Sequence, residues 1–390
     1  MNTLPTISRR ARWAIPVGAV ALAGAVTAGS LISTAQASPE LPLRTPAQLL
    51  ASVAGRDAPP PALTGTVVET ASLGLPQLPG TSNQNSITSL LAGSHTIKVW
   101  YADPQHIRLA VPVTLSETDV IRDGRQVSVW QSNSNTVTRM QVPAKASAAD
   151  SHAKAMPSGV PLTPQQAASQ ALKAVGPSTR VTVDRTVTVA GQPAYQLVLS
   201  PRSSGSLIGR VSIAIDATRN VPLRVQVFAR GAASPAIQVG FTSISFVKPA
   251  AGNFSFKTPA GAKVKLVNPT AVEGPRVSAK SRKAGGEPQV IGKGWLSVAV
   301  LPASDLAGVL GAGSASSAAG VGSQSVSSGS GESGAMAAAM MRSATAVHGA
   351  WGSGRLLHTS LVNVLMTSSG HVLVGAVTPA VLFAAAAQVK

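Results

Sequence analysis

The sequence predicts an α+β fold: one large, strongly curved antiparallel sheet of ten or eleven strands, followed by a small C-terminal α+β unit. Three observations predict it. Apolar residues alternate at period two in short segments between residues 63 and 256, turn pairs such as Asp123-Gly124 separate these segments, and one helical pattern interrupts them. Strands that follow one another with almost no helical crossovers pair antiparallel, and a sheet of this size curves.

The first expected elements are a short helix and a strand. Thr45-Pro46 is typical of an N-cap followed by proline at the first helical position, which predicts a helix that ends near Ala54. A strand is predicted over Leu63–Ala71. The stretch from Leu73 to Gly93 is rich in Gly, Pro, Ser and Asn, so we expect a long mobile loop there.

An antiparallel meander follows this loop. Its turn signals are Asp103-Pro104, Asp123-Gly124 and the polar stretch Ser132 to Asn135, and Asp-Gly is among the strongest short hairpin signals. Strands are therefore predicted over residues 96–101, 107–113, 120–122, 127–131 and 136–142.

A single amphipathic helix is expected near the middle of the sheet. A polar loop (residues 145–161) precedes it, Thr163-Pro164 begins it, and Gly176-Pro177 stops it. Ala168, Leu172 and Val175 share one face of this helix. Strand patterns then resume over residues 181–190, 194–200, 209–216, 223–230, 236–247 and 253–256.

The rest of the chain is predicted to form a linker and a second, smaller unit. Residues 45–267 are the sheet domain, residues 268–293 a basic linker, and residues 294–390 a small α+β unit. Its Gly/Ser/Ala tract, residues 311–334, cannot bury a core and is expected to be a disordered loop. Strands are predicted over residues 295–302, 356–366 and 372–377, and a helix from Thr378-Pro379 to Gln388. The segment 356–366 is apolar on both faces, so we expect both faces to be buried.

The N-terminal segment predicts export. Arg9, Arg10 and Arg12 precede the apolar run Trp13–Ile32, and Ala35-Gln36-Ala37 is a small-x-small cleavage pattern. Residues 1–37 are therefore typical of a secretory signal peptide. The alternative is an uncleaved membrane anchor, because 20 apolar residues suffice to span a bilayer. Either way we expect an extracytoplasmic protein, secreted or tethered to the cytoplasmic membrane by residues 13–32.

Composition limits the partners and the chemistry. The chain carries 32 Lys plus Arg against 14 Asp plus Glu, a net charge of +18. Loss of residues 1–37 removes three arginines and no acid, which leaves +15. For an exported chain, this positive charge indicates that the binding partners are anionic membrane surfaces or acidic envelope polymers, and not nucleic acid. The sequence has no cysteine, which excludes a disulfide, a thiolate metal site, a cysteine nucleophile and a lipid-modified N-terminal cysteine.

No pattern in the sequence indicates catalysis, a cofactor or a metal ion. Gly329 to Gly334 matches GxGxxG, but no strand precedes it and no helix follows, so the match is attributed to the Gly/Ser tract. His95 and His106 should lie ~20 Å apart along their hairpin, and His358 and His371 ~26 to 33 Å apart, too far to share an ion. A carboxylate-based hydrolase needs a pair of acidic residues close together, and this chain has only 14 acidic residues scattered along its length. A hydrolase or transferase is therefore the third-ranked class of function.

The informative residues are apolar ones at period two. Val211 and Ile213, then Val225 and Val227, then Val239 and Phe241 are examples, and the simplest interpretation is a sheet core covered by helices. The functional interpretation is an apolar groove left open to a lipid chain, since only 3% of the residues are aromatic and few bulky side chains are present to fill it. The residues predicted to line the groove are Val99, Tyr101, Val129, Val211, Ile213, Val225, Val227, Val239 and Phe241. The residues predicted to form a basic rim are Arg108, Arg122, Arg125, Arg139, Arg210 and Arg224.

A family resemblance adds to this interpretation. The element order, the stretches Gly65 to Thr70, His95 to Tyr101 and Asp119 to Arg125, and the segment Asn253 to Val264 resemble the LolA-type lipoprotein carriers and the related MucB/RseB sigma-factor regulators, most of all exported members from high-GC Gram-positive bacteria. The resemblance covers residues 45 to 267 and leaves residues 268 to 390 unexplained.

The resemblance implies an open half-barrel with helices on its concave face that holds acyl chains or a lipidated partner. The first hypothesis is thus a non-enzymatic envelope protein that binds a lipid or an acylated protein in the groove. The alternative is a MucB/RseB-like sensor that binds an envelope protein or a membrane-bound regulator. The chain departs from lipoprotein relatives because it has no cysteine to lipidate.

Overall fold

The fold is described from a computed structural model of the chain. The described residues are 39–54, 59–74, 92–113, 115–142, 162–173, 175–267, 289–303 and 343–389. The chain divides into residues 1–38 and residues 39–390, and every described residue belongs to the second unit. The predicted signal peptide or anchor, the tract 311–334 and most of the predicted loops and linker lie outside the described residues.

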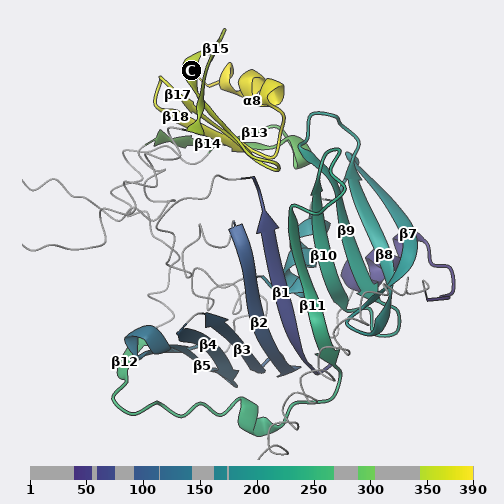
Figure 1. Cartoon of the computed structure of the whole chain (residues 1–390), viewed down its shortest axis with the longest axis vertical. Coiled ribbons are helices and arrows are strands. Elements are labelled where there is room, and N and C mark those ends of the chain that lie inside the picture. The colour runs from purple at the N-terminus through teal and green to yellow at the C-terminus, as the bar shows by residue number, and fades with distance from the viewer. Residues whose placement is uncertain are drawn as a thin grey trace, which may run out of the picture. The chain divides into compact units, whose positions relative to one another are not determined.

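The larger of two sheets has twelve strands and confirms the predicted fold class. It is strongly curved and does not close into a barrel, because β12 and β7 remain at its two edges (Figure 1). The strand order is β12-β6-β5-β4-β3-β2-β1-β11-β10-β9-β8-β7. The strands are β1 (Leu63–Ser72), β2 (Ala92–Asp103), β3 (His106–Val113), β4 (Ser116–Asp123), β5 (Gln126–Gln131), β6 (Thr136–Gln141), β7 (Thr179–Val189), β8 (Gln192–Pro201), β9 (Ile208–Asp216), β10 (Pro222–Ala229), β11 (Ile237–Ser245) and β12 (Lys263–Val267).

The count of twelve corrects the prediction of ten or eleven strands, and one strand was placed wrongly. The segment predicted as a strand over residues 253–256 instead follows a 3₁₀ turn, η3 (Ala251–Asn253). Its alternation arises because Phe254 is buried, with its ring 5.8 Å from that of His106. The last strand is β12, which pairs parallel to β6, so the sheet is mixed. Residues 246–262 connect β11 to β12 without an α-helix.

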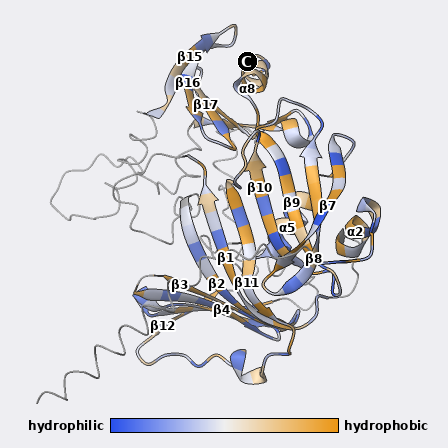
Figure 2. Cartoon of the chain, turned by 45° about the vertical axis from the view of Figure 1, so that its right-hand side comes forward, coloured by the Kyte–Doolittle hydropathy of each residue, from blue (hydrophilic) through white to orange (hydrophobic). Residues whose placement is uncertain are grey.

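Period-two alternation explains how the strands bury one face. Cross-strand registration places Val99 opposite Leu109 and Val225 opposite both Val239 and Ile213, so these side chains share one face. Figure 2 shows the resulting alternation of orange and blue bands along β9 and β10. We call this side of the sheet the groove face and the other side the outer face.

Two helices of similar sequence pack beside this sheet. The helix α2 (Pro46–Ala54) follows Thr45, and α5 (Pro164–Lys173) follows Thr163. Each begins with a capping box: the backbone N–H of Gln48 donates to the Thr45 hydroxyl at 3.2 Å, and that of Gln166 to the Thr163 hydroxyl at 3.4 Å. The predicted positions of both helices are confirmed.

The C-terminal residues form a separate six-stranded sheet. Its order is β13-β14-β18-β17-β16-β15. The strands are β13 (Gln289–Ile291), β14 (Val298–Pro302), β15 (Thr345–Gly349), β16 (Gly352–His358), β17 (Asn363–Thr367) and β18 (His371–Gly375), and the helix α8 (Pro379–Ala386) follows. The single strand predicted over residues 356–366 is wrong, because the Thr359 hydroxyl accepts from Val362 N–H and closes a turn that divides the segment into β16 and β17.

Hydrogen bonds and apolar contacts join residues of the two sheets. The indole N–H of Trp295 donates to the hydroxyl of Thr179 at 2.7 Å, and both residues are buried. The backbone N–H of Thr378 donates to the carbonyl of Gly205 at 2.8 Å. Leu361 packs with Leu73 in a small apolar cluster. Residues 39–390, which include both sheets, therefore form one compact unit.

Candidate functional site

The nine predicted groove residues all lie on the groove face. Tyr101 is registered with Ile107, and Val129 with Val120, in the strands β2 to β5. Val227 is registered with Val211 in the strands β9 and β10. The alternation that selected these residues thus identified one continuous face, which stretches across most of the sheet.

This face is covered in the structure, so its apolar side chains are packed and not open to solvent. Seven of the nine predicted residues are buried, and Tyr101 and Val227 are half-buried. The nine divide between two apolar clusters. One cluster contains Val99, Val129, Val239 and Phe241, with Tyr101 against it, and the other contains Val211, Ile213 and Val225, with Val227 against it.

The cover over the second cluster is made of helices. The helix α5 contacts β10 and β11, and α2 contacts β7. Leu49 of α2 and Ala168 of α5 are fully buried against the groove face. Apart from Leu172, the residues of α5 that face the sheet are small: Ala167, Ala168 and Ala171. A helix that contacts a sheet mainly through alanines buries little apolar area, so α5 is a weakly attached cover.

Glu69 is an acid on this apolar face. It lies in β1 between His95 of β2 and Val239 of β11 and is 8% exposed. Its Oε2 atom has no hydrogen-bond partner among the described residues. Burial raises the pKa of the Glu69 carboxyl above its ordinary value, while His95 and the backbone N–H of Leu162, next to the cap of α5, act in the opposite direction. A buried carboxyl with an unfilled acceptor therefore lies close to where α5 begins.

The six arginines predicted to form a basic rim do not form one continuous ring in the structure. Arg108, Arg139, Arg210 and Arg224 project from the outer face, since their registered neighbours alternate with groove residues. Arg122 and Arg125 lie at the β4–β5 turn and donate to the carbonyls of Gly124 and Val142. In a strand, the residue that directly precedes or follows a groove valine points to the opposite face. This alternation would have assigned Arg210 and Arg224 to the outer face from the sequence alone.

The outer-face arginines are held by specific contacts. Arg139 donates to the Thr258 hydroxyl at 2.6 Å, and the guanidinium of Arg210 lies 3.8 Å from the centre of the Phe228 ring. The side chain of Arg224 covers Gly240, whose missing Cβ leaves room for it, and burial lowers the pKa of this arginine. Arg139, Arg210 and Arg224 form no ion pair with any described residue, so these three side chains add positive charge to the outer face.

Arg108 forms an ion pair with Asp119. Its Nη2 atom lies 2.7 Å from Oδ2 of Asp119, which is 3% exposed, and its guanidinium lies 5.1 Å from the centre of the Trp100 ring. Burial raises the pKa of the Asp119 carboxyl, and Arg108 opposes that shift. A fixed cation thus stacks on one face of Trp100.

The described residues contain neither a candidate metal centre nor a helix that could span a membrane. No group of three or more His, Asp or Glu side chains among them could hold a metal ion. His106 pairs with Asp103 at 2.8 Å, and His358 contacts Asn363 at 2.7 Å, so these histidines serve turns and strand ends. None of the described helices has both the length and the hydropathy needed to cross a membrane.

Comparison with known proteins gives structural neighbours alone. No protein-family model and no curated protein matches the sequence. Among solved structures, the MucA/MucB complex of Pseudomonas aeruginosa is 14% identical, with a TM-score of 0.39, and the match covers 87% of this chain and 96% of that chain. A LolA superfamily protein of Nitrosomonas europaea is 9% identical, with a TM-score of 0.22, over 55% of this chain and 99% of that chain.

A conserved protein of Thermus thermophilus is a third neighbour. It is 12% identical, with a TM-score of 0.31, over 57% of this chain and 98% of its own. Both groups that the sequence resembles are therefore among the structural neighbours. Because the sequence identities and TM-scores are low, these neighbours do not indicate what the chain does. Its origin among exported proteins of high-GC Gram-positive bacteria stays a prediction.

Three acids are buried among the described residues, and sequence reasoning singled out none of them: Glu69, Asp119 and Asp216. Asp216 accepts from the backbone N–H groups of Thr218 and Arg219 in a turn. Glu69 stands at an inward position of the alternating run Val67, Glu69, Ala71, so a charged residue in an apolar register was the available signal. Asp119 gave no such signal, because it stands on the outer face, where charged residues are ordinary. Its burial depends on packing within the folded sheet.

Proposed function

We propose that this chain is a non-enzymatic, extracytoplasmic protein that binds an acyl chain, of a lipid or of an acylated protein, on the groove face beneath α5. The observation that supports the proposal most directly is the weak cover. A continuous apolar face built from Val, Ile and Leu side chains is covered over β10 and β11 by a ten-residue helix that buries only Pro164 and Ala168.

The energies favour displacement of this cover by an acyl chain. A C16 chain buries about 15 methylene-scale groups at ~0.8 kcal/mol each, roughly 12 kcal/mol gross. The buried side of α5 offers three alanine methyl groups, one leucine and the ring of Pro164, which at the same scale contribute less than the acyl chain does. The closed form is then the resting form, and binding proceeds when α5 moves off the face.

The basic outer face supports attraction to anionic membranes. Each Lys or Arg near a membrane surface contributes about 1 kcal/mol, and the exported chain keeps a charge of +15. Residues 13–32, whether cleaved or retained, decide between a secreted and a tethered form under this proposal.

The absence of cysteine makes the movement of α5 directly testable. One cysteine introduced into α5 and one into β10, which are in contact, would form a disulfide that fixes the cover. We expect the oxidised double variant to lose binding of a fluorescent fatty acid and to regain it on reduction. Each single-cysteine variant is the matched control and should bind as the parent does. Equal binding by the oxidised and reduced forms would refute entry beneath α5.

A second candidate function, binding of a protein partner as in the sensor hypothesis, is favoured by the edge strand β12. Among the described strands β12 pairs with β6 alone, and its Val264 and Leu266 side chains are 46% and 80% exposed. Lys263 and Lys265 alternate with them. An unpaired edge with this pattern fits an extended, acidic protein segment that adds a strand.

Charge reversal tests that second candidate. A labelled ten-residue peptide of alternating valine and glutamate should bind the parent chain, and its valine-lysine counterpart should not. The double variant Lys263→Glu, Lys265→Glu should exchange that preference. Binding of both peptides alike, or of neither, would reject β12 as the docking edge.

A further inference from the structure

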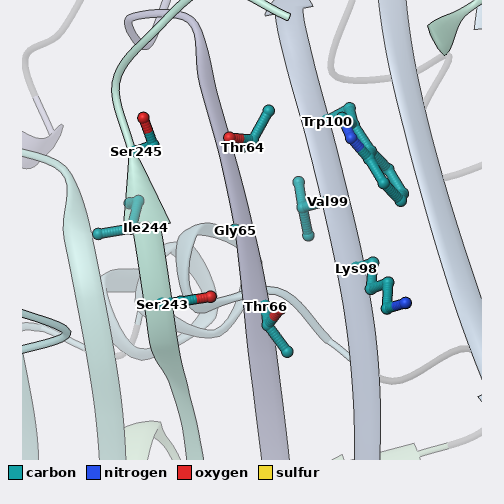
Figure 3. Close-up of a pocket in the computed structure, with 9 residues that line it drawn as sticks. All are labelled: Thr64, Gly65, Thr66, Lys98, Val99, Trp100, Ser243, Ile244 and Ser245. Atoms are coloured by element: carbon teal, nitrogen blue, oxygen red, sulfur yellow. The ribbon is translucent and has the colours of Figure 1, made fainter. Parts of the chain in front are cut away.

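A shallow pocket lined by both polar and apolar atoms lies on the outer face, across three neighbouring strands. It has a volume of about 310 Å³ and is formed by three residues from each of β1, β2 and β11. The register pairs Thr64 with Trp100 and Ser245, and Thr66 with Lys98 and Ser243. The middle row of this grid is Gly65, Val99 and Ile244 (Figure 3).

The hollow is open on the outer face only. A Cβ atom at Gly65 would lie 2.8 Å from the Phe241 ring, so Phe241 fills the groove side of this position. The six outer residues, four with hydroxyl groups together with Lys98 and Trp100, project away from the groove, and Figure 3 shows Lys98 and Trp100 extending to the same side of β2. A β-bulge between Ser243 and Phe241 bends β11 beside the pocket.

The polar groups of the pocket have unused hydrogen-bonding capacity. In the described part of the chain, the side-chain hydroxyls of Thr64, Thr66 and Ser243 make no hydrogen bond, and Lys98 is exposed and forms no ion pair. A hydroxyl both donates and accepts, and a lysine ammonium donates three hydrogen bonds. The pocket thus offers several directional contacts and one positive charge.

Trp100 provides a firmly held flat surface beside these groups. Arg108 stacks on one side of its ring, and the buried Asp119 holds Arg108 at 2.7 Å. Trp100 remains partly exposed. An aromatic ring fixed from one side is prepared to receive a flat apolar surface on the other, since little side-chain entropy is then lost on binding.

We propose that this pocket binds an acidic saccharide. One face of a sugar ring carries C–H groups that stack on Trp100, the sugar hydroxyls match Thr64, Thr66 and Ser243, and a carboxylate on the sugar pairs with Lys98. The pocket lies on the opposite face from the acyl-binding groove, so it requires neither the groove nor movement of α5. An exported chain with a charge of +15 meets acidic polymers in the cell envelope.

The test uses the purified whole protein and three probes. A hyaluronan hexasaccharide supplies carboxylates, chitohexaose is a neutral sugar of equal length, and inorganic phosphate is a bare anion. Titration calorimetry in about 150 mM salt should show binding of the hyaluronan hexasaccharide, with chitohexaose weaker by about tenfold and phosphate unable to compete. No binding of the hyaluronan hexasaccharide, or full competition by phosphate, would overturn the proposal.

Variants separate the pocket from the general positive charge. Lys98→Gln and Trp100→Leu should each raise the Kd for the hyaluronan hexasaccharide about tenfold. Lys293→Gln, at an exposed lysine outside β12, the groove face and the pocket, is the matched control and should change it less than about twofold. Equal losses in Lys98→Gln and Lys293→Gln would indicate non-specific charge and refute the site. Fatty-acid binding should stay unchanged in Lys98→Gln, so failure of either proposal is distinguishable from failure of the other.

Discussion

Glu69 shows how one side chain links the groove face to pH. Burial raises the pKa of its carboxyl above the ordinary value of 4.5. A raised pKa means that the folded chain binds this proton more tightly than the unfolded chain does. The contribution of Glu69 to the free energy of unfolding is therefore fully present below pH 4.5 and declines as the pH rises through the raised pKa.

Replacement of Glu69 by glutamine should remove that pH-dependent loss. At pH 7 we expect Glu69→Gln to unfold about 2 °C or more above the parent chain, because an amide needs no charge to be buried. Below pH 4.5 the two should coincide. Thermal unfolding of both proteins, followed by circular dichroism from below pH 4.5 to pH 7, measures this difference in stability. Glu40→Gln, at an exposed glutamate, is the control.

Two results would contradict this account of Glu69. One is a variant less stable than the parent at pH 7, and the other is an unchanged slope of stability with pH. The slope that remains in Glu69→Gln should belong to Asp119, whose pKa burial also raises.

The element that decides function under our account is α5. Its capping box, Thr163 with Gln166, satisfies donors at the start of the helix, and the same box begins α2 at Thr45 with Gln48. These twin caps allow a matched comparison, because equal changes can be made in the helix proposed to move and in a helix proposed to stay.

Loss of the α5 cap should favour the open groove. Thr163→Ala removes about 1 kcal/mol from the helix, which should strengthen the apparent affinity for a fluorescent fatty acid about fivefold. Thr45→Ala should leave this affinity nearly unchanged. Fluorescence titration with the fatty acid measures the affinity of both variants. An equal change of affinity in both would show that α5 is not the cover that moves.

At the level of elements, the sequence predicted most of the sheet because period-two alternation and turn residues act locally. It did not predict β12, whose exposed Lys-Val-Lys-Leu-Val pattern has no buried face to mark it. It also joined β16 to β17, because apolar residues continue through the turn at Leu361 and Val362. The groove face followed from alternation, whereas the cover and the pocket depend on long-range packing.

Across the whole molecule, Trp295 couples residues of the two sheets. Its indole N–H donates to the buried Thr179 hydroxyl at 2.7 Å. Trp295→Phe keeps most of the apolar packing and loses this hydrogen bond, which should lower the free energy of unfolding by about 1 kcal/mol. Trp351→Phe, whose ring stacks on Phe383 within the C-terminal residues, is the control.

Urea unfolding followed by fluorescence measures this coupling. We expect a single transition in the parent chain, displaced to lower urea in Trp295→Phe, because residues 39–390 form one contact unit. Two separate transitions in the parent chain would show that the sheets unfold independently and would remove Trp295 from this role.

The central claim is that the groove face accommodates an acyl chain. Native mass spectrometry of the protein, purified from cells and then stripped of lipid and loaded with a C16 fatty acid, tests it most directly. We predict one added mass of a single acyl-chain ligand per chain, absent from the oxidised α5–β10 disulfide variant and restored by reduction. Spectra that show the bare chain alone at every fatty-acid concentration, or equal loading of the oxidised variant, would contradict it.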